Sequence, residues 1–123
     1  MAIIAADATD YIRQKIKWTC DELDMHTMLY PTAEDALKAF ESHGQGICEG
    51  VVIDITFVGS MDGITAVQKM RELEPTLPVL FITALDVRAD PSIQLHIAAL
   101  GGRWLKKPFY DDQLKAEIEG MVG

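Results

Sequence analysis

The chain of 123 residues has little cysteine, no excess of basic residues and no long apolar run. Two cysteines cannot supply a disulfide framework or a zinc site. Lysine and arginine total 11 against 19 aspartates and glutamates, for a net charge of −8; non-specific nucleic-acid binding needs a basic footprint. No signal peptide or membrane span is recognisable. We therefore expect a cytoplasmic protein that binds neither a membrane nor, by itself, nucleic acid.

Short apolar runs alternate with amphipathic segments along the whole chain. Apolar positions 12, 16, 20 and 23, spaced by four, four and three residues, predict a helix with one buried face. The composition, 49% hydrophobic and 24% charged, is that of an ordinary globular domain. The predicted strands are 3–6, 25–30, 51–53, 79–82 and 104–105. The predicted helices are 10–23, 32–43, 62–73, 90–100 and 114–122, with 42–50 read as a glycine-bearing loop.

Continuous apolar strands are buried on both faces, which implies a parallel sheet covered by helices. The fold class is therefore α/β, a doubly wound parallel sheet with five strands and five helices. In such a fold the binding site lies at the carboxyl ends of the strands. There the sequence places Asp7, Asp54, Thr83 and Lys107, which precedes Pro108.

These residue types suit phosphoryl chemistry. Two carboxylates can hold Mg²⁺, which takes oxygen ligands and keeps several waters. An aspartate can also act as a nucleophile and form an acyl phosphate. A lysine contributes a point positive charge suited to a phosphate. Each residue also has a plain structural explanation: Asp7 as a helix cap, Asp54 and Thr83 as strand ends, Lys107 as a solvated loop charge.

An ordered set of motifs resembles the receiver domain of two-component response regulators over essentially the whole chain. The set is Ile3-Ile4-Ala5-Ala6-Asp7 with Arg13 six residues on, Val52-Ile53-Asp54, Met61-Asp62-Gly63, Ile82-Thr83-Ala84 and Trp104-Leu105-Lys106-Lys107-Pro108-Phe109. The resemblance implies a flavodoxin-like sheet of strand order 2-1-3-4-5. It also implies a single receiver domain over 1–123 without an output domain, either stand-alone or cut from a longer protein.

The resemblance assigns a role to each matched residue. Asp54 is the phosphoacceptor, and Thr83 and Lys107 bind the phosphoryl group. The Lys107–Pro108 peptide bond is expected to be cis, and Trp104 occupies the position of the switch aromatic. The implied Mg²⁺ ligands are Asp7, Asp54 and the carbonyl of Thr56.

The implied partners are a histidine kinase or phosphotransfer protein and a downstream protein. The downstream protein would bind the surface of the fourth helix, fifth strand and fifth helix. A monomer or weak homodimer is expected. Phosphotransfer to Asp54 would be self-catalysed, so a signalling domain rather than an enzyme is favoured.

Three departures from the family pattern favour an alternative, a phosphorylation-independent pseudo-receiver that serves as a protein-interaction module. Counting back from Arg13, the second acid of the metal pocket is replaced by Ala8, which implies weak Mg²⁺ binding. Asp10 is near in sequence, and a shift by one residue would instead put Asp7 in the second slot. The segment 55–61 is one residue longer than usual, and Trp104 is larger than the usual switch ring.

Two further alternatives carry less support. Asp54-Ile55-Thr56 superficially resembles the nucleophile motif of haloacid-dehalogenase-type phosphotransferases, but the chain has little room for their additional acid or cap. A flavodoxin is compatible with the fold class, but no phosphate-binding loop rich in Thr, Ser and Gly follows the first strand.

Overall fold

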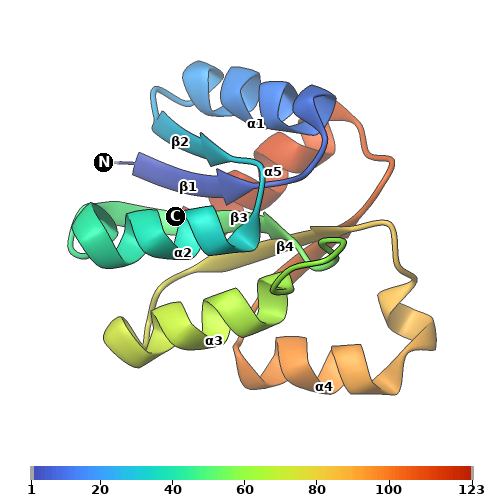
Figure 1. The fold of residues 1–123 in the computed structure, drawn as a ribbon. Helices are drawn as coiled ribbons and strands as arrows, with labels where there is room; N and C mark the ends of the chain where they lie inside the picture. Colours follow the sequence, from blue (N-terminus) through green and yellow to red (C-terminus); the bar gives the residue numbers. More distant parts are fainter. Residues whose placement is uncertain (1, 123) are drawn as a thin grey trace.

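The computed structural model describes residues 2–122, apart from the side chain of His43, and is built around one central sheet (Figure 1). All neighbouring strands are parallel, in the order β2-β1-β3-β4-β5. This confirms the predicted doubly wound sheet and its strand order. The strands are β1 (Ala2–Ala6), β2 (His26–Tyr30), β3 (Cys48–Asp54), β4 (Val79–Thr83) and β5 (Arg103–Lys106).

Helices cover both faces of the sheet. Two helices, α1 (Asp10–Glu22) and α5 (Asp111–Val122), lie on one face (Figure 1). The other face carries α2 (Ala33–Ala39), α3 (Gly63–Leu73) and α4 (Pro91–Ala99). The predicted helix 32–43 is α-helical only to Ala39 and continues as a π-helical turn, η1 (Phe40–Gly44). A short 3₁₀ turn, η2 (Val87–Ala89), that was not predicted precedes α4.

Alternation of side chains along the strands divides the interior into two cores. Ile4 and Ile53 point to the α2–α3–α4 side, whereas Ile3 and Val52 point to the α1–α5 side. All of these side chains are fully buried. Because the central strands are apolar on both faces, the two helical layers hold the sheet from both sides and fix where its carboxyl ends lie.

Three helices begin at the capping residues that the sequence indicates. The side-chain oxygens of Thr32, Asp62 and Asp90 accept hydrogen bonds from the backbone N–H three residues on, at 3.1, 2.7 and 3.2 Å. Pro91 is the first residue of α4, as expected. Each such cap stabilises its helix by about 1 kcal/mol.

The prediction of a loop over residues 42–50 is wrong at both ends. The π-helical turn continues to Gly44, and β3 begins at Cys48. Gly50 lies within β3, where a Cβ would be 2.9 Å from the Cε of Met121 on α5. Its glycine therefore reflects close packing of α5 on the sheet rather than a turn.

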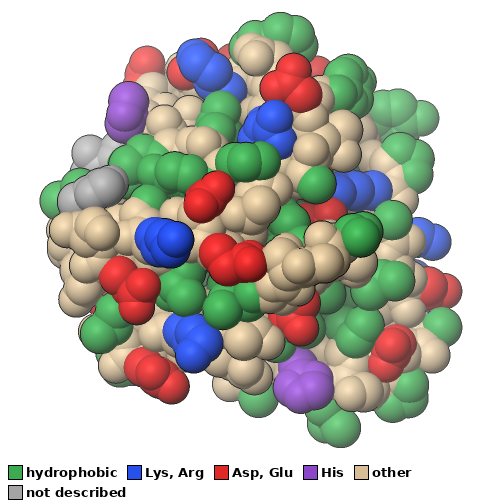
Figure 2. Space-filling model, viewed as in Figure 1, with side chains coloured by type: hydrophobic (Ala, Val, Ile, Leu, Met, Phe, Trp, Pro, Cys, Tyr) green, Lys and Arg blue, Asp and Glu red, His purple; other side chains and the backbone are tan. Residues whose placement is uncertain are grey.

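Two aromatic side chains of α1 lie at the surface. Tyr11 and Trp18 are 66% and 57% exposed. Figure 2 shows acidic and basic side chains interspersed over the visible face, so the net negative charge is not gathered there. Within residues 2–122, no helix has the length and apolar character needed to span a membrane.

Candidate functional site

The four polar residues predicted at the strand ends lie together at the carboxyl edge of the sheet. Asp7 directly follows β1, Asp54 ends β3, Thr83 ends β4 and Lys107 directly follows β5. In the strand register Ala6 is opposite Ile53, which brings the next residue of each strand, Asp7 and Asp54, side by side. This edge is the right-hand side of the sheet in Figure 1.

The side chain of Lys107 bridges the two carboxylates. Its Nζ donates to Oδ2 of Asp7 at 2.5 Å and to Oδ2 of Asp54 at 2.9 Å. The side chains of Asp7 and Asp54 are 1% and 12% exposed. Burial alone would lower the pKa of Lys107, but the hydrogen bonds and negative charges of Asp7 and Asp54 outweigh it and raise that pKa above its ordinary value.

Backbone groups hold the second oxygen of each carboxylate. The Thr9 N–H donates to Oδ1 of Asp7 at 2.8 Å, and the Thr56 N–H donates to Oδ1 of Asp54 at 3.2 Å. Arg13 donates from Nη1 to the backbone carbonyl of Asp7 at 2.7 Å. Both carboxylates are therefore fixed in orientation, with one oxygen facing Lys107 and the other facing a backbone N–H.

Lys107 and Thr83 are joined through the backbone. The Lys107 N–H donates to the carbonyl of Thr83 at 2.7 Å, and the peptide bond to Pro108 is cis. Thr83 is fully buried, and its hydroxyl oxygen accepts from the Leu85 N–H at 3.0 Å. That contact leaves the hydroxyl proton of Thr83 able to serve as a donor.

A close approach of α3 to the site explains one glycine. A Cβ on Gly63 would lie 1.9 Å from the carbonyl oxygen of Asp54, so only glycine fits there. The Gly63 N–H donates to the carbonyl of Ile55 at 2.9 Å. In the long segment between β3 and α3, Gly59 has a positive φ of 73° and Val58 is 98% exposed. The extra length therefore projects outward from the site.

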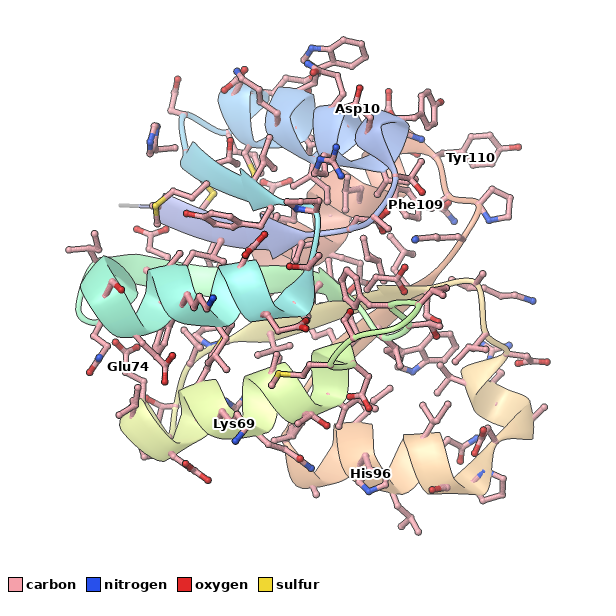
Figure 3. The ribbon with its side chains drawn as sticks, viewed as in Figure 1. Asp10, Lys69, Glu74, His96, Phe109 and Tyr110 are labelled. Atoms are coloured by element: carbon pink, nitrogen blue, oxygen red, sulfur yellow. The ribbon has the colours of Figure 1, made fainter. Side chains whose placement is uncertain are left out.

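The second acid of the metal pocket is replaced by Ala8, and the nearby Asp10 does not take over its role. Ala8 is exposed beside Asp7. The side chain of Asp10 is 97% exposed and pairs with Arg13 at 3.2 Å, and Figure 3 shows it at the start of α1. Among the described residues, no group of three or more acidic, histidine or cysteine side chains could hold a metal ion.

The donors that are present still fit Mg²⁺. Mg²⁺ is commonly bound by one or two carboxylates together with waters and phosphate oxygens. Two neighbouring carboxylates are held here in fixed orientation, and the backbone of Thr56 lies beside one of them. The residues that would hold the ion are Asp7, Asp54 and Thr56 through its carbonyl.

Trp104 is half-buried on the outer strand β5. The Cζ of Arg88 lies 5.7 Å from the centre of its ring, within the range of a cation–π contact. Both side chains line an open groove of about 540 Å³ beside β5, between η2 and the start of α5. The groove is lined by Asp86, Arg88, Trp104, Leu105, Lys106, Pro108 and Gln113.

One contact at the site has no signal in the sequence. Lys15 of α1 donates from Nζ to the carbonyl of Phe109 at 2.8 Å. The two residues are 94 positions apart, and a lysine on an amphipathic helix is ordinarily a surface charge. Only the packing of α1 against the segment before α5 reveals the contact.

The structure thus combines a doubly wound parallel sheet with a lysine-bridged pair of aspartates at its carboxyl edge. Residues 3–119 match the family described as response regulator receiver domain. The chain therefore belongs to the receiver domain family of response regulators, a family that accepts phosphoryl groups in two-component signalling.

Individual relatives agree with this assignment. The transcriptional regulatory protein TctD of Salmonella typhimurium is 38% identical over 71 residues, covering 58% of this chain and 30% of TctD. FixJ of Bradyrhizobium diazoefficiens is 26% identical over 121 residues, covering 98% of this chain and 56% of FixJ. The chain thus spans only part of these curated relatives.

A solved structure supports the fold. A CheY-like receiver domain protein from Methanospirillum hungatei superposes with a TM-score of 0.85 at 18% sequence identity. The match covers 98% of this chain and 92% of that protein.

Proposed function

We propose that Asp54 accepts a phosphoryl group from a histidine kinase or a phosphotransfer protein. The observation that carries this proposal is the Lys107 ammonium, held 2.9 Å from Oδ2 of Asp54 by a second carboxylate, Asp7. Such an ammonium lies where negative charge gathers when a phosphoryl group reaches Asp54. Preorganised positive charge of this kind is the main source of catalysis in phosphoryl transfer.

In the proposed step, an oxygen of the Asp54 carboxylate forms a bond to phosphorus. The phosphorus–nitrogen bond of the donor phosphohistidine breaks, and its electron pair leaves with the imidazole, which takes up a proton. The product is an acyl phosphate on Asp54. Lys107 then pairs with phosphoryl oxygens, and the Thr83 hydroxyl donates a hydrogen bond to one of them.

Bound Mg²⁺ would supply further positive charge that neutralises the phosphoryl oxygens. Asp7, Asp54 and the carbonyl of Thr56 would hold the ion. With Ala8 in place of a second acid, fewer charged ligands are available, so we expect weak binding. The Asp7 carboxylate keeps two tasks, orienting Lys107 and contributing negative charge to the metal pocket.

The signal would leave through the α4–β5–α5 side. Thr83 ends β4, and the segment after it continues through η2 to α4. A movement of Thr83 toward a phosphoryl group would shift this segment, including Arg88 over the ring of Trp104. The groove beside Trp104 is the surface on which we expect a downstream protein to bind.

Intact-mass measurement after incubation with Mg²⁺ and acetyl phosphate tests phosphorylation. We expect a phosphoryl adduct on the wild-type protein and none on Asp54→Asn. The absence of an adduct on the wild type would contradict the proposal. Together with undetectable Mg²⁺ binding, it would favour the pseudo-receiver, for which the exposed Ala8 at the site is the supporting observation.

A further inference from the structure

Lys15 of α1 points into the molecule instead of toward solvent. Its side chain is only 13% exposed. Its Nζ donates to the backbone carbonyl of Phe109 at 2.8 Å and pairs with Oδ1 of Asp111 at 3.2 Å. One ammonium therefore attaches α1 both to the segment between β5 and α5 and to the first residue of α5.

Aromatic rings flank the same ammonium. Nζ lies 4.9 Å from the ring centre of Phe109 and 5.8 Å from that of Tyr11. Phe109 is buried in the α1–α5 core, so Lys15 binds a residue that is itself packed in the interior. By contrast, Lys17 on the same helix is 46% exposed and pairs with Asp21 one turn away. Such exposed pairs contribute little.

The contact of Lys15 is close to the phosphorylation site along the chain. Phe109 follows Lys107 by two residues, with the rigid Pro108 between them. Figure 3 shows Phe109 and Tyr110 on the segment that passes beside the first turns of α1, near Asp10. On the other side of the ion pair, Arg13 of the same helix holds the carbonyl of Asp7 at 2.7 Å.

Two side chains of α1 thus bind the backbone on both sides of the Asp7–Lys107 ion pair, each by a hydrogen bond to a carbonyl. Arg13 holds the segment that carries Asp7, and Lys15 holds the segment that carries Lys107. In these hydrogen bonds Arg13 does not bind the segment that carries Lys107, and Lys15 does not bind the segment that carries Asp7. Two cations spaced two residues apart on one helix therefore contribute to the relative position of the two segments.

We propose that Lys15 is a positioning residue that sets where the Lys107 ammonium stands relative to Asp54. The inference rests on the proposed phosphorylation of Asp54. Without the Lys15 contact, the segment 107–109 keeps its backbone bond to Thr83 and the packing of Phe109 in the α1–α5 core, but loses its hydrogen bond to α1. Misplacement of a catalytic group by 1 Å can reduce a rate by about 100-fold, so a smaller displacement has room for a measurable effect.

The test compares three variants in the acetyl phosphate reaction with Mg²⁺. Lys15→Met keeps the apolar stem but removes the charge and the donor, and we expect phosphorylation to slow by roughly tenfold, within the range that misplacement produces. Lys15→Arg retains a cationic donor and should restore most of the rate. Lys17→Met, the matched control on the same helix, should leave the rate unchanged.

Amide chemical shifts separate positioning from a general loss of structure. The Tyr110 amide senses hydrogen bonding at the Phe109 carbonyl, and the Lys107 amide senses movement of the catalytic lysine. We expect Lys15→Met to shift both signals and Lys15→Arg to return them. An unchanged rate in Lys15→Met, or a slowed rate with the Lys107 signal unmoved, would overturn the inference.

The failure of the inference differs from the failure of the proposed function. If the wild-type protein acquires a phosphoryl adduct but Lys15→Met acquires it equally fast, the role of Lys15 is wrong and the proposed function stands. If the wild-type protein acquires no adduct, the proposed function fails, and the positioning role fails with it.

Discussion

Replacing Lys107 by methionine should destabilise the fold at neutral pH, because it leaves two nearly buried carboxylates facing each other. Methionine retains most of the apolar stem and removes only the ammonium. Asp7 and Asp54 both contact that ammonium, at 2.5 and 2.9 Å, and their side chains are 1% and 12% exposed. In the variant, neither carboxylate has the cation that offsets its burial.

The size of the effect follows from Coulomb's law. Two oxygens that share one nitrogen at these distances lie no more than about 5 Å apart, and at an effective dielectric constant of about 20 their unit charges repel by about 3 kcal/mol. Breaking a buried ion pair by removing one partner costs about 3–5 kcal/mol in other proteins. We therefore expect Lys107→Met to lower the free energy of unfolding by about 3 kcal/mol.

Urea unfolding followed by circular dichroism measures this loss, with Lys106→Met as the control because Lys106 is the exposed neighbour. The pKa of Lys107 is raised in the folded state above its ordinary value of 10.5. Its contribution is therefore complete below 10.5 and is lost as the pH rises through the folded-state pKa. The wild type and Lys107→Met should accordingly converge in stability in strong alkali.

A loss below about 1 kcal/mol at pH 7, the range of a surface ion pair, would refute the reasoning. It would mean that the two carboxylates separate or are hydrated once the ammonium is gone.

Three further predictions follow from the same site and its surroundings. Ala8→Asp should tighten Mg²⁺ binding at least about tenfold, because charged ligands set cation affinity; titration by calorimetry checks this, and equal affinities would contradict it. Gly63→Ala should unfold or strongly destabilise the protein, because its Cβ would lie 1.9 Å from the Asp54 carbonyl oxygen. In the control Gly120→Ala, the Cβ meets only the flexible tip of an arginine at 2.5 Å. Equal melting temperatures for the two variants would contradict this prediction. Burial, and then the charge of Asp21, raise the pKa of Cys20 to about 12, so the folded protein should resist iodoacetamide at this thiol until urea is added; alkylation at the same rate before and after unfolding would contradict this.

Local signals account for the parts of the structure that the sequence predicts well. Alternating apolar runs and helical spacing identify every strand and every major helix. Thr32, Asp62 and Asp90 mark helix starts because a cap acts within three residues of itself. The error over 42–50 arose because Gly50 was read as a turn residue, whereas its small size serves packing against Met121.

The sequence by itself determines the residues of the site, and the tertiary structure decides how they are connected. Polar residues at the ends of buried strands identify Asp7, Asp54, Thr83 and Lys107, because parallel strands present their carboxyl ends at one edge. Chain distance hides the rest: Lys107 reaches Asp7 across 100 positions, and Lys15 reaches Phe109 across 94. The first contact depends on the order of the strands in the sheet and the second on how α1 packs beside the segment before α5, and local periodicity carries no information about either.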